Sequence, residues 1–228
     1  MKMYGATDIG LVRATNQDNF YIDTVGKWAV VTDGMGGHNG GETASSMAVE
    51  EIKRSMSQGV GLKESISNAN TVVYKKSIDN PQLMGMGTTV VLCEVLGGRV
   101  NIAHVGDSRA YLYRDHKLKQ ITKDHSIVQQ LIDSGTITQE QSRFHPQRNL
   151  ITRAVGTEKN VLIDYNTLDF GEKDCILICS DGLSSYVDEK DILDILENTK
   201  SSEAVDKLIA AANESGGKDN VTVVLIKA

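Results

Sequence analysis

Four aspartates in this sequence stand where an apolar run meets a turn. The set consists of Asp33, Asp107, Asp181 and Asp219. Asp33 and Asp181 each end an apolar run that is typical of a buried strand, and a glycine follows each of them. A half-buried carboxylate is costly unless it is paired or binds a metal ion, and few basic residues stand near these positions. The pattern therefore favours bound cations.

Hard divalent cations suit such a set, because Mg²⁺ and Mn²⁺ take oxygen ligands. Asp33 is suited to bridge two ions, since the turn after it exposes the carbonyl of Gly34. Two ions about 3.5–4 Å apart can bind phosphoryl oxygens and activate a water molecule. Arg13, which stands five residues before Asp18, can hold two phosphate oxygens in a bidentate contact. These residue types indicate chemistry on a phosphate ester.

Length and charge exclude several other classes. The chain has 228 residues, a net charge of −6, two prolines and no Ser/Gly linker, so we expect a single domain over residues 1–228. No basic stripe is present, which argues against nucleic acid or an anionic membrane as a partner. Neither a signal peptide nor a run of about 18 apolar residues occurs, so we expect a cytoplasmic protein. The three cysteines are expected to be buried free thiols.

Hydrophobic periodicity predicts strands at both ends of the chain with helices between them. Strands are predicted at 4–8, 19–24, 27–32, 88–96, 99–105, 110–114, 117–121, 161–168, 174–180 and 221–226. Helices are predicted at 42–56, 62–78, 126–133, 188–196 and 202–213, with Ser126 as a cap and capping-box spacing at Thr138. Strand runs with hairpin-like turns and paired helices indicate the α+β class, with stacked antiparallel sheets and helices outside. The longest irregular stretch is 134–152.

Six short motifs, in order along the chain, resemble those of the metal-dependent protein phosphatase 2C family in its bacterial branch. They are Arg13-x-x-Asn16-Gln17-Asp18, Val31–His38, Gly85–Thr89, Val105–Ala110, Cys179–Leu183 and Lys218–Thr222. Each motif alone is weak, because Asp-Gly pairs are common in turns. Six in the right order, each at the right kind of element, make the resemblance specific, and they span essentially the whole chain.

The resemblance implies a four-layer αββα fold, in which a β-sandwich of two antiparallel sheets is flanked by helix pairs. It implies hydrolysis of phosphoserine and phosphothreonine in proteins by metal-activated water, without a phosphoenzyme. By position, Asp33 bridges two Mn²⁺ or Mg²⁺ ions and Gly34 supplies its carbonyl. Asp181 and Asp219 ligate one of these ions.

Further roles follow from the same resemblance. Asp18 orients a metal-bound water and Arg13 binds the phosphate. Asp107, with Asp181, matches the acids that hold a weaker third ion in bacterial members, and the segment at about 125–152 matches a mobile flap near the active site. The partners implied are phosphorylated proteins, with a Ser/Thr kinase and its substrates, and the domain is implied to be a monomer.

The sequence departs from the eukaryotic pattern of this family at two positions. Met35 stands where those enzymes carry a histidine thought to act as general acid, and Gln17 where they carry a glutamate that helps hold the second metal. The general acid is therefore unassigned, with a metal-bound water and His38 as candidates. For Asp107 a second interpretation stays open, that of a turn acid that bonds the Ser108 amide.

Two other functions fit part of this pattern. A catalytically inactive phosphatase-like module would bind a phosphoprotein or a regulator, but every expected metal acid is present. An enzyme with Asp33 as covalent nucleophile would form an aspartyl phosphate, but Met35 stands where such enzymes require a second aspartate. The metal-dependent phosphatase is therefore the preferred prediction.

Overall fold

Two antiparallel sheets form the centre of the protein. The computed structural model describes residues 1–36 and 40–228. Sheet A has the strand order β1-β11-β10-β7-β8, and sheet B has the order β2-β3-β5-β6-β9, with β4 paired to β3. The strands are β1 (Lys2–Asp8), β2 (Asp18–Asp23), β3 (Trp28–Met35), β4 (Gly87–Thr88), β5 (Val90–Leu96), β6 (Arg99–Val105), β7 (Arg109–Arg114), β8 (Lys117–Gln120), β9 (Asp164–Asp169), β10 (Cys175–Cys179) and β11 (Val221–Lys227).

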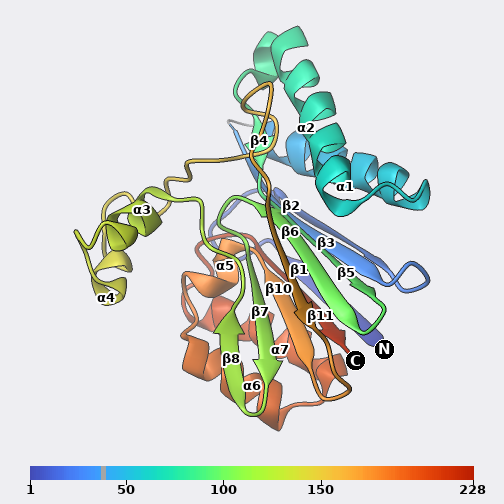
Figure 1. Ribbon diagram of the computed structural model, residues 1–228. Coiled ribbons are helices and arrows are strands. Elements are labelled where there is room, and N and C mark those ends of the chain that lie inside the picture. The colour runs from blue at the N-terminus through green and yellow to red at the C-terminus, as the bar shows by residue number, and fades with distance from the viewer. Residues whose placement is uncertain (37–39) are drawn as a thin grey trace.

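Helices cover both outer faces of this sandwich. They are α1 (Gly40–Ser57), α2 (Leu62–Asp79), a 3-10 turn at Pro81–Leu83, α3 (Ile127–Asp133), α4 (Gln139–Ser142), α5 (Asp181–Ser184), α6 (Glu189–Asn198) and α7 (Ser201–Glu214). Figure 1 shows α1 and α2 on one side of the sandwich and α6 and α7 on the other, while α3 and α4 project to the left. The αββα arrangement predicted from the sequence is confirmed.

Three apolar clusters join the layers. Successive side chains of a strand point to opposite faces, so β10 serves two of these clusters. Ile176 and Ile178 pack between the two sheets, whereas Leu177 and Cys179 pack against α6 and α7. The third cluster lies between sheet B and the α1–α2 pair and includes the fully buried Ile52. Burial of each large aliphatic side chain stabilises the fold by about 1.5–3 kcal/mol.

Most predicted boundaries are shifted by one or two residues, and three differences concern the site or have a clear cause. β3 does not stop at Asp33 but continues to Met35, because its last two residues pair with β4. Asp181 does not stand in a turn, since it is the first residue of α5. The strand predicted from 161 begins at Asp164, where its pairing with β6 begins. Secondary structure therefore fixes the backbones of both Asp33 and Asp181.

Residues 125–152 leave the sandwich and return to it, and this segment is called the flap. Ser126 caps α3 with its side chain and Thr138 forms a capping box at α4, as the sequence predicts. The two ends of the flap pair with each other through a bridge between Ser126 and Ile151. The helices of the flap therefore lie on an arm whose ends are held together at the sandwich.

The three cysteines are free and buried, as predicted from the sequence. Burial raises the pKa of the Cys175 thiol to about 12, and that of Cys179 likewise to about 12. Such thiols stay protonated and are poor nucleophiles. Within the described part of the chain, each helix is too short or too polar to cross a membrane.

Candidate metal and phosphate site

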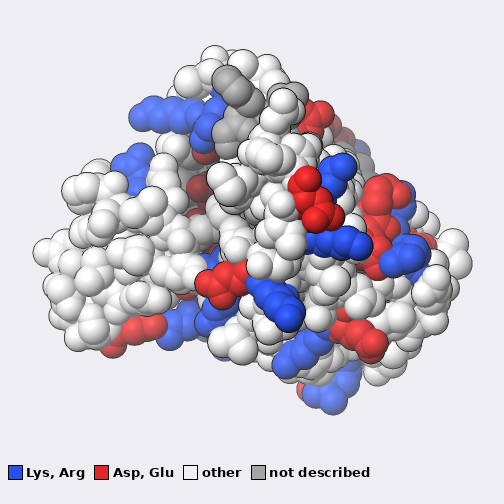
Figure 2. Space-filling view, turned by 90° about the horizontal axis from the view of Figure 1, so that it is seen from above, with Lys and Arg blue, Asp and Glu red and all other residues white. Residues whose placement is uncertain are grey.

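A cavity of about 360 Å³ is lined by residues from both sheets. It contains most of the residues that the resemblance assigns to the site, namely Arg13, Asp33, Gly34, Asp107, Asp181 and Asp219. Asp18 is buried beside the cavity, as the cross-strand partner of Asp33. Figure 2 looks down on this face, where red acidic atoms lie recessed beside the large lobe at the left. The fold thus gathers residues that are as many as 206 positions apart in the sequence.

Both sheets contribute strand ends to this cavity. Asp33 comes from β3 of sheet B, whereas Asp181 follows β10 and Asp219 precedes β11, both in sheet A. Asp107 lies in the short connection where the chain passes from β6 of sheet B to β7 of sheet A. Packing of the two sheets is therefore what brings the four carboxylates together.

Hydroxyl groups fix the backbone of Asp33. Its N–H donates to Thr89 Oγ1 at 3.0 Å, and its carbonyl accepts from Thr89 N at 2.9 Å and from Thr88 Oγ1 at 3.0 Å. Thr89 Oγ1 also lies 2.6 Å from Ser108 Oγ, beside Asp107. Thr89 thus joins the strand that carries Asp33 to the connection that carries Asp107.

Close backbone contact requires a glycine at position 34. A Cβ on Gly34 would lie 2.1 Å from the Gly41 carbonyl oxygen and 2.7 Å from that of Gln17. Gly34 N also donates to this Gln17 oxygen at 3.1 Å. The first turn of α1 therefore packs directly on the backbone next to Asp33, and any side chain would push the two apart.

Asp18 is held by buried hydroxyl groups between the two sheets. Only 8% of it is exposed, and Ser180 Oγ donates to its Oδ2 at 2.7 Å. Ser180 Oγ in turn accepts from Thr222 N at 2.9 Å. Asp18 Oδ1 is buried without a hydrogen-bond partner among the described residues. An unpartnered buried carboxylate oxygen is costly, and it marks a place for a donor that the protein itself does not supply.

Burial and like charges raise the pKa of the acids around the cavity. Burial raises the pKa of Asp33 well above its usual value, and the charges of Asp18 and Asp181 add to the effect. Asp107 shifts in the same direction, again mainly because of burial. Burial and the charge of Asp219 raise the pKa of Asp181 to about 6.

A divalent cation among these carboxylates would reverse the shifts, because it favours their charged forms. The donors are oxygens, which suits Mn²⁺ or Mg²⁺ rather than a soft metal. Three acids of the site lack a positive partner in the described part of the chain. Asp18 has a buried oxygen without a hydrogen bond among the described residues, and Asp33 and Asp107 lie buried beside other carboxylates. The residues present therefore fit a group of hard cations.

Arg13 reaches the cavity from the loop between β1 and β2. Its Nη2 donates to Asp219 Oδ2 at 2.7 Å, and this hydrogen bond raises the pKa of Arg13. The Arg13 side chain is 51% exposed, so other N–H groups of the guanidinium face solvent. The resemblance assigns Asp219 to a metal and Arg13 to phosphate. The structure adds a contact between them that the sequence did not predict.

Asn220 holds the loop that carries Arg13. Its Oδ1 accepts from Gln17 N at 2.8 Å, and its Nδ2 donates to the carbonyls of Ile9 and Thr15 at 3.0 Å each. The loop is thereby pinned at three points to the start of β11. These contacts, together with the hydrogen bond from Arg13 to Asp219, fix the position of the guanidinium relative to the acids.

Three residues that support the site had no role in the sequence-based prediction. They are Thr89, Ser180 and Asn220, and each stands inside one of the six motifs. The available signal was a small polar residue next to an assigned ligand or at the end of its motif. Their partners lie far away in the sequence, so only the fold shows what they bind.

The general acid is not located by the described residues. His38 lies outside them. Met35 lines the cavity, and a thioether has no proton to donate. Asn149 and Ile151, at the end of the flap, also line the cavity, so the flap borders the site as the resemblance implies.

The fold and the cavity define a class of protein, an αββα sandwich with an oxygen-donor cluster for hard cations beside an arginine. Within this class, the family model described as Protein phosphatase 2C matches residues 12–222. The chain belongs to this family.

Relatives and solved structures agree with this assignment. The serine/threonine phosphatase stp of Listeria monocytogenes serotype 4b (strain F2365) is 37% identical over 235 residues, which cover 97% of this chain and 93% of that protein. The serine/threonine protein phosphatase PstP of Mycobacterium tuberculosis (strain CDC 1551 / Oshkosh) is 39% identical over 226 residues, which cover 96% of this chain and 43% of that protein.

Two structures of PstP are similar to this fold over nearly the whole chain. The crystal structure of the Mycobacterium tuberculosis serine/threonine phosphatase PstP/Ppp has a TM-score of 0.93 at 37% identity, covering 100% of this chain and 99% of that one. The catalytic domain of PstP in complex with 2 manganese ions has a TM-score of 0.90 at 36% identity, covering 98% of this chain and 96% of that one.

Proposed function

We propose that this protein is a Mn²⁺- or Mg²⁺-dependent serine/threonine protein phosphatase. The observation that carries the proposal is the convergence of the aspartates and Arg13 on one cavity. Hydrolysis of a phosphate monoester needs charge neutralisation for the phosphoryl group and a donor for its oxygens. Cations held by the cluster of oxygen donors would neutralise the charge, and the exposed guanidinium of Arg13 would donate to the phosphate oxygens.

The ligand assignment comes from the family resemblance, and the shared cavity supports it. Asp33 and the Gly34 carbonyl would hold two cations, and Asp181 and Asp219 would complete the set. Asp107, which reaches the same cavity from the connection between the sheets, would hold a third cation together with Asp181. When bound, such ions lower the pKa of a water molecule and offset the charge of the phosphate.

Asp18 and Arg13 act on the water and on the phosphate. Ser180 donates to Oδ2 of Asp18 and leaves Oδ1 without a partner, so Oδ1 accepts a hydrogen bond from the attacking water and orients it. Arg13 donates to phosphate oxygens with N–H groups that Asp219 does not occupy. Water attacks phosphorus and the bond from phosphorus to the serine or threonine oxygen breaks. A proton of the water passes to that oxygen, so the products are the free hydroxyl side chain and inorganic phosphate, and no phosphoenzyme forms.

The substrates are proteins that carry phosphoserine or phosphothreonine, and a Ser/Thr kinase is the opposing enzyme. Relatives named as serine/threonine phosphatases support this substrate class. In the same proposal, residues 1–228 form a single catalytic domain that acts in the cytoplasm as a monomer, with the flap beside its site.

Two alternatives make different predictions. An inactive phosphatase-like module binds Mn²⁺ but does not turn over a phosphopeptide. An enzyme with Asp33 as nucleophile forms a trappable acyl phosphate, although the acids around Asp33 oppose the approach of a phosphate dianion.

The test is hydrolysis of a phosphothreonine peptide with added Mn²⁺ and with excess chelator. We expect Asp33→Asn to lower turnover by more than about 100-fold, since a bridging ligand is lost. The control is Asp206→Asn, which removes an exposed acid of α7. Full activity in chelator, or wild-type turnover in Asp33→Asn, contradicts the proposal.

A further inference from the structure

A cluster of two histidines, an aspartate and an arginine lies at the base of the flap, outside the residues assigned to catalysis. It consists of His104, His125, Arg153 and Asp164. Ligand atoms of the histidines and of Asp164 lie within 4.8 Å of one another. The two rings stack with centroids 4.8 Å apart and planes at 15°. Their lone pairs therefore lie in two nearly parallel planes, which is unfavourable for binding one ion between them.

The cation of this cluster is a guanidinium. Arg153 Nη1 lies 3.0 Å from His125 Nε2 and donates to Asp164 Oδ1 at 2.8 Å. It also donates to the Leu162 carbonyl at 3.3 Å. The space between the histidine and the carboxylate is therefore occupied by a side chain of the protein itself, and the cluster is an ion-pair network rather than a metal site.

The ring of His125 contacts a different segment through each of its nitrogens. Gly106 N donates to Nδ1 at 3.0 Å, so the ring proton is on Nε2. The 3.0 Å contact between Nε2 and Arg153 Nη1 then joins two donors and is not a hydrogen bond, since both bind Asp164. Nε2 faces Asp164 Oδ2 at 3.4 Å. His125 N also donates to the Gly106 carbonyl at 2.9 Å. Gly106 is thus bound by both the backbone and the side chain of His125, and it directly precedes Asp107.

The other side of Asp107 is attached to the same segment. Arg109 donates to the carboxylate of Asp124 through Nη2 at 2.7 Å and through Nε at 3.0 Å. Both side chains are largely buried, with exposed fractions of 20% and 9%, so the pair is only weakly screened. Residues on either side of Asp107 are therefore held by Asp124 and His125, the residue before the flap and its first residue.

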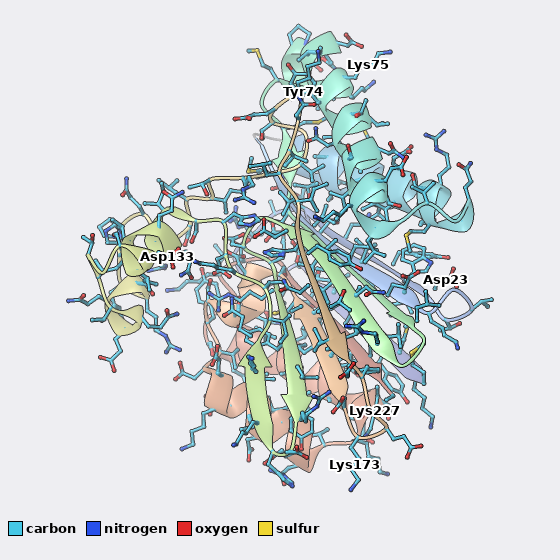
Figure 3. The ribbon with its side chains drawn as sticks, viewed as in Figure 1. Asp23, Tyr74, Lys75, Asp133, Lys173 and Lys227 are labelled. Atoms are coloured by element: carbon cyan, nitrogen blue, oxygen red, sulfur yellow. The ribbon has the colours of Figure 1, made fainter. Side chains whose placement is uncertain are left out.

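The two ends of the flap also meet at His125. Thr152 N donates to the His125 carbonyl at 2.7 Å, and the next residue, Arg153, binds Asp164 of β9. Asp133, on helix α3 of the flap, pairs with Lys123 Nζ at 2.7 Å just before the flap begins, and Figure 3 shows it to the left of the strands. Arg143 of the flap also binds Asp188 in front of α6, while the contacts of the flap with His125 and Asp164 lie at its ends.

We propose that His125 is a positioning residue that couples the flap to the turn that carries Asp107. Nε2 faces the Arg153–Asp164 pair at the exit of the flap, while Nδ1 and the backbone hold Gly106. A displacement of either flap end moves His125, and with it the Asp107 carboxylate at the cavity. Only the consequence for cation binding rests on the proposed function; the coupling itself does not.

Three variants of the full chain separate the two contacts of the ring. His125→Leu removes both nitrogens. His125→Asn keeps an acceptor near the position of Nδ1 and loses the contacts of Nε2. The matched control is His116→Leu, which removes an exposed histidine whose Nδ1 lies 2.8 Å from Glu197 Oε1, in the β7–β8 turn at the far end of sheet A (Figure 1).

Hydrogen exchange of the metal-free protein is the first measurement. Loss of one buried hydrogen bond should speed exchange about tenfold in the segment that it holds. We expect His125→Leu to speed exchange at 105–109 and at 127–150, His125→Asn to speed it at 127–150 alone, and His116→Leu to change neither. Unchanged exchange at 105–109 in His125→Leu overturns the coupling. If His125→Leu does not fold, then unchanged hydrogen exchange of the flap in His125→Asn overturns the coupling.

Calorimetric titration with Mn²⁺ is the second measurement. We expect His125→Leu to weaken the weakest Mn²⁺ site by about tenfold and His125→Asn to bind like the wild type. Wild-type affinity at every site in His125→Leu overturns the effect on Asp107. A wild-type protein that binds no Mn²⁺ refutes the proposed function instead, and the exchange data then decide the coupling on their own.

Discussion

Without divalent cations, the stability of this protein should fall relative to that of its Asp18→Asn variant as the pH rises from about 4 to about 7. Burial raises the pKa of Asp18 from 3.8 to about 7, with a contribution from the charges of Asp181 and Asp219. The carboxyl of the unfolded chain titrates near its usual value. In this pH window the folded state therefore holds more protons than the unfolded state, so stability decreases as the pH rises.

The size of the effect follows from the pKa difference. A rise from 3.8 to about 7 corresponds to about 4 kcal/mol of unfolding free energy once Asp18 is ionised in both states. A typical domain unfolds with only about 5–15 kcal/mol. Ionisation of Asp18 at neutral pH should therefore lower the unfolding free energy of the metal-free protein by a large fraction of its total.

The comparison with Asp18→Asn is needed because the titration of His125 changes the stability with pH in the opposite direction from that of Asp18. Burial, together with His104 and Arg153, lowers the pKa of His125 from 6.5 to about 4. The unfolded chain then holds more protons than the folded one, so this group makes stability rise between about pH 4 and pH 6.5. Asp18→Asn keeps His125 and removes the carboxylate. The difference between the two proteins therefore reports Asp18 together with the part of the raised Asp33 pKa that the Asp18 charge causes.

The assay is urea unfolding in chelator, followed by the fluorescence of Trp28, the one tryptophan of the chain. Asp206→Asn should run parallel to the wild type at every pH. Excess Mn²⁺ should remove the loss of stability at neutral pH, because a cation favours the charged acids. A difference between wild type and Asp18→Asn that stays constant from about pH 4 to pH 7 would refute the assignment of a raised pKa to Asp18.

Three further substitutions test other parts of the site. Arg13→Ala should raise KM about tenfold and change kcat less, because an exposed guanidinium binds phosphate similarly before and during the reaction. Steady-state kinetics on a phosphopeptide measure both constants, and a loss confined to kcat would contradict this role of Arg13. Gly34→Ala should cost about 3 kcal/mol through its contact with Gly41, a fall in Tm of roughly 6–12 °C; an unchanged Tm would contradict the close approach. Thr89→Val should lower the free energy of unfolding by about 1–3 kcal/mol, because Asp33 N loses its acceptor. Thr89→Ser should restore the urea midpoint of the wild type. Equal midpoints for the two variants would show that the hydroxyl group does not stabilise the site.

The layers of the fold could be predicted from local patterns. The alternation of Ile176 and Ile178 with Leu177 follows from a strand packed on both faces, and the caps at Ser126 and Thr138 follow from side chains that bond only a few residues away. Signals of this kind lie within one element. They were sufficient for most of the strands and longer helices and for the layered arrangement, but not for the short helix α5 at Asp181.

The contacts that complete the site could not be predicted in the same way. Ser180 donates to Asp18 across 162 positions of sequence, and Arg13 reaches Asp219 across 206. No periodicity relates such pairs, since their distance depends on how two sheets pack. The extension of β3 beyond Asp33 has the same cause, because it depends on pairing with β4, which is 52 residues or more away along the chain.

The energetic cost of the acidic cluster is an argument against a purely structural role. In the sequence alone each aspartate resembles an ordinary residue at a strand end or turn, where Asn would supply similar local hydrogen bonds without charge. Together, however, Asp33 and Asp107 have raised pKa values, and Asp18 keeps a buried oxygen without a partner among the described residues. Neutral side chains at these positions would make the isolated fold more stable. An arrangement that weakens the protein on its own, and that a divalent cation would relieve, is what a cation-dependent catalytic site requires.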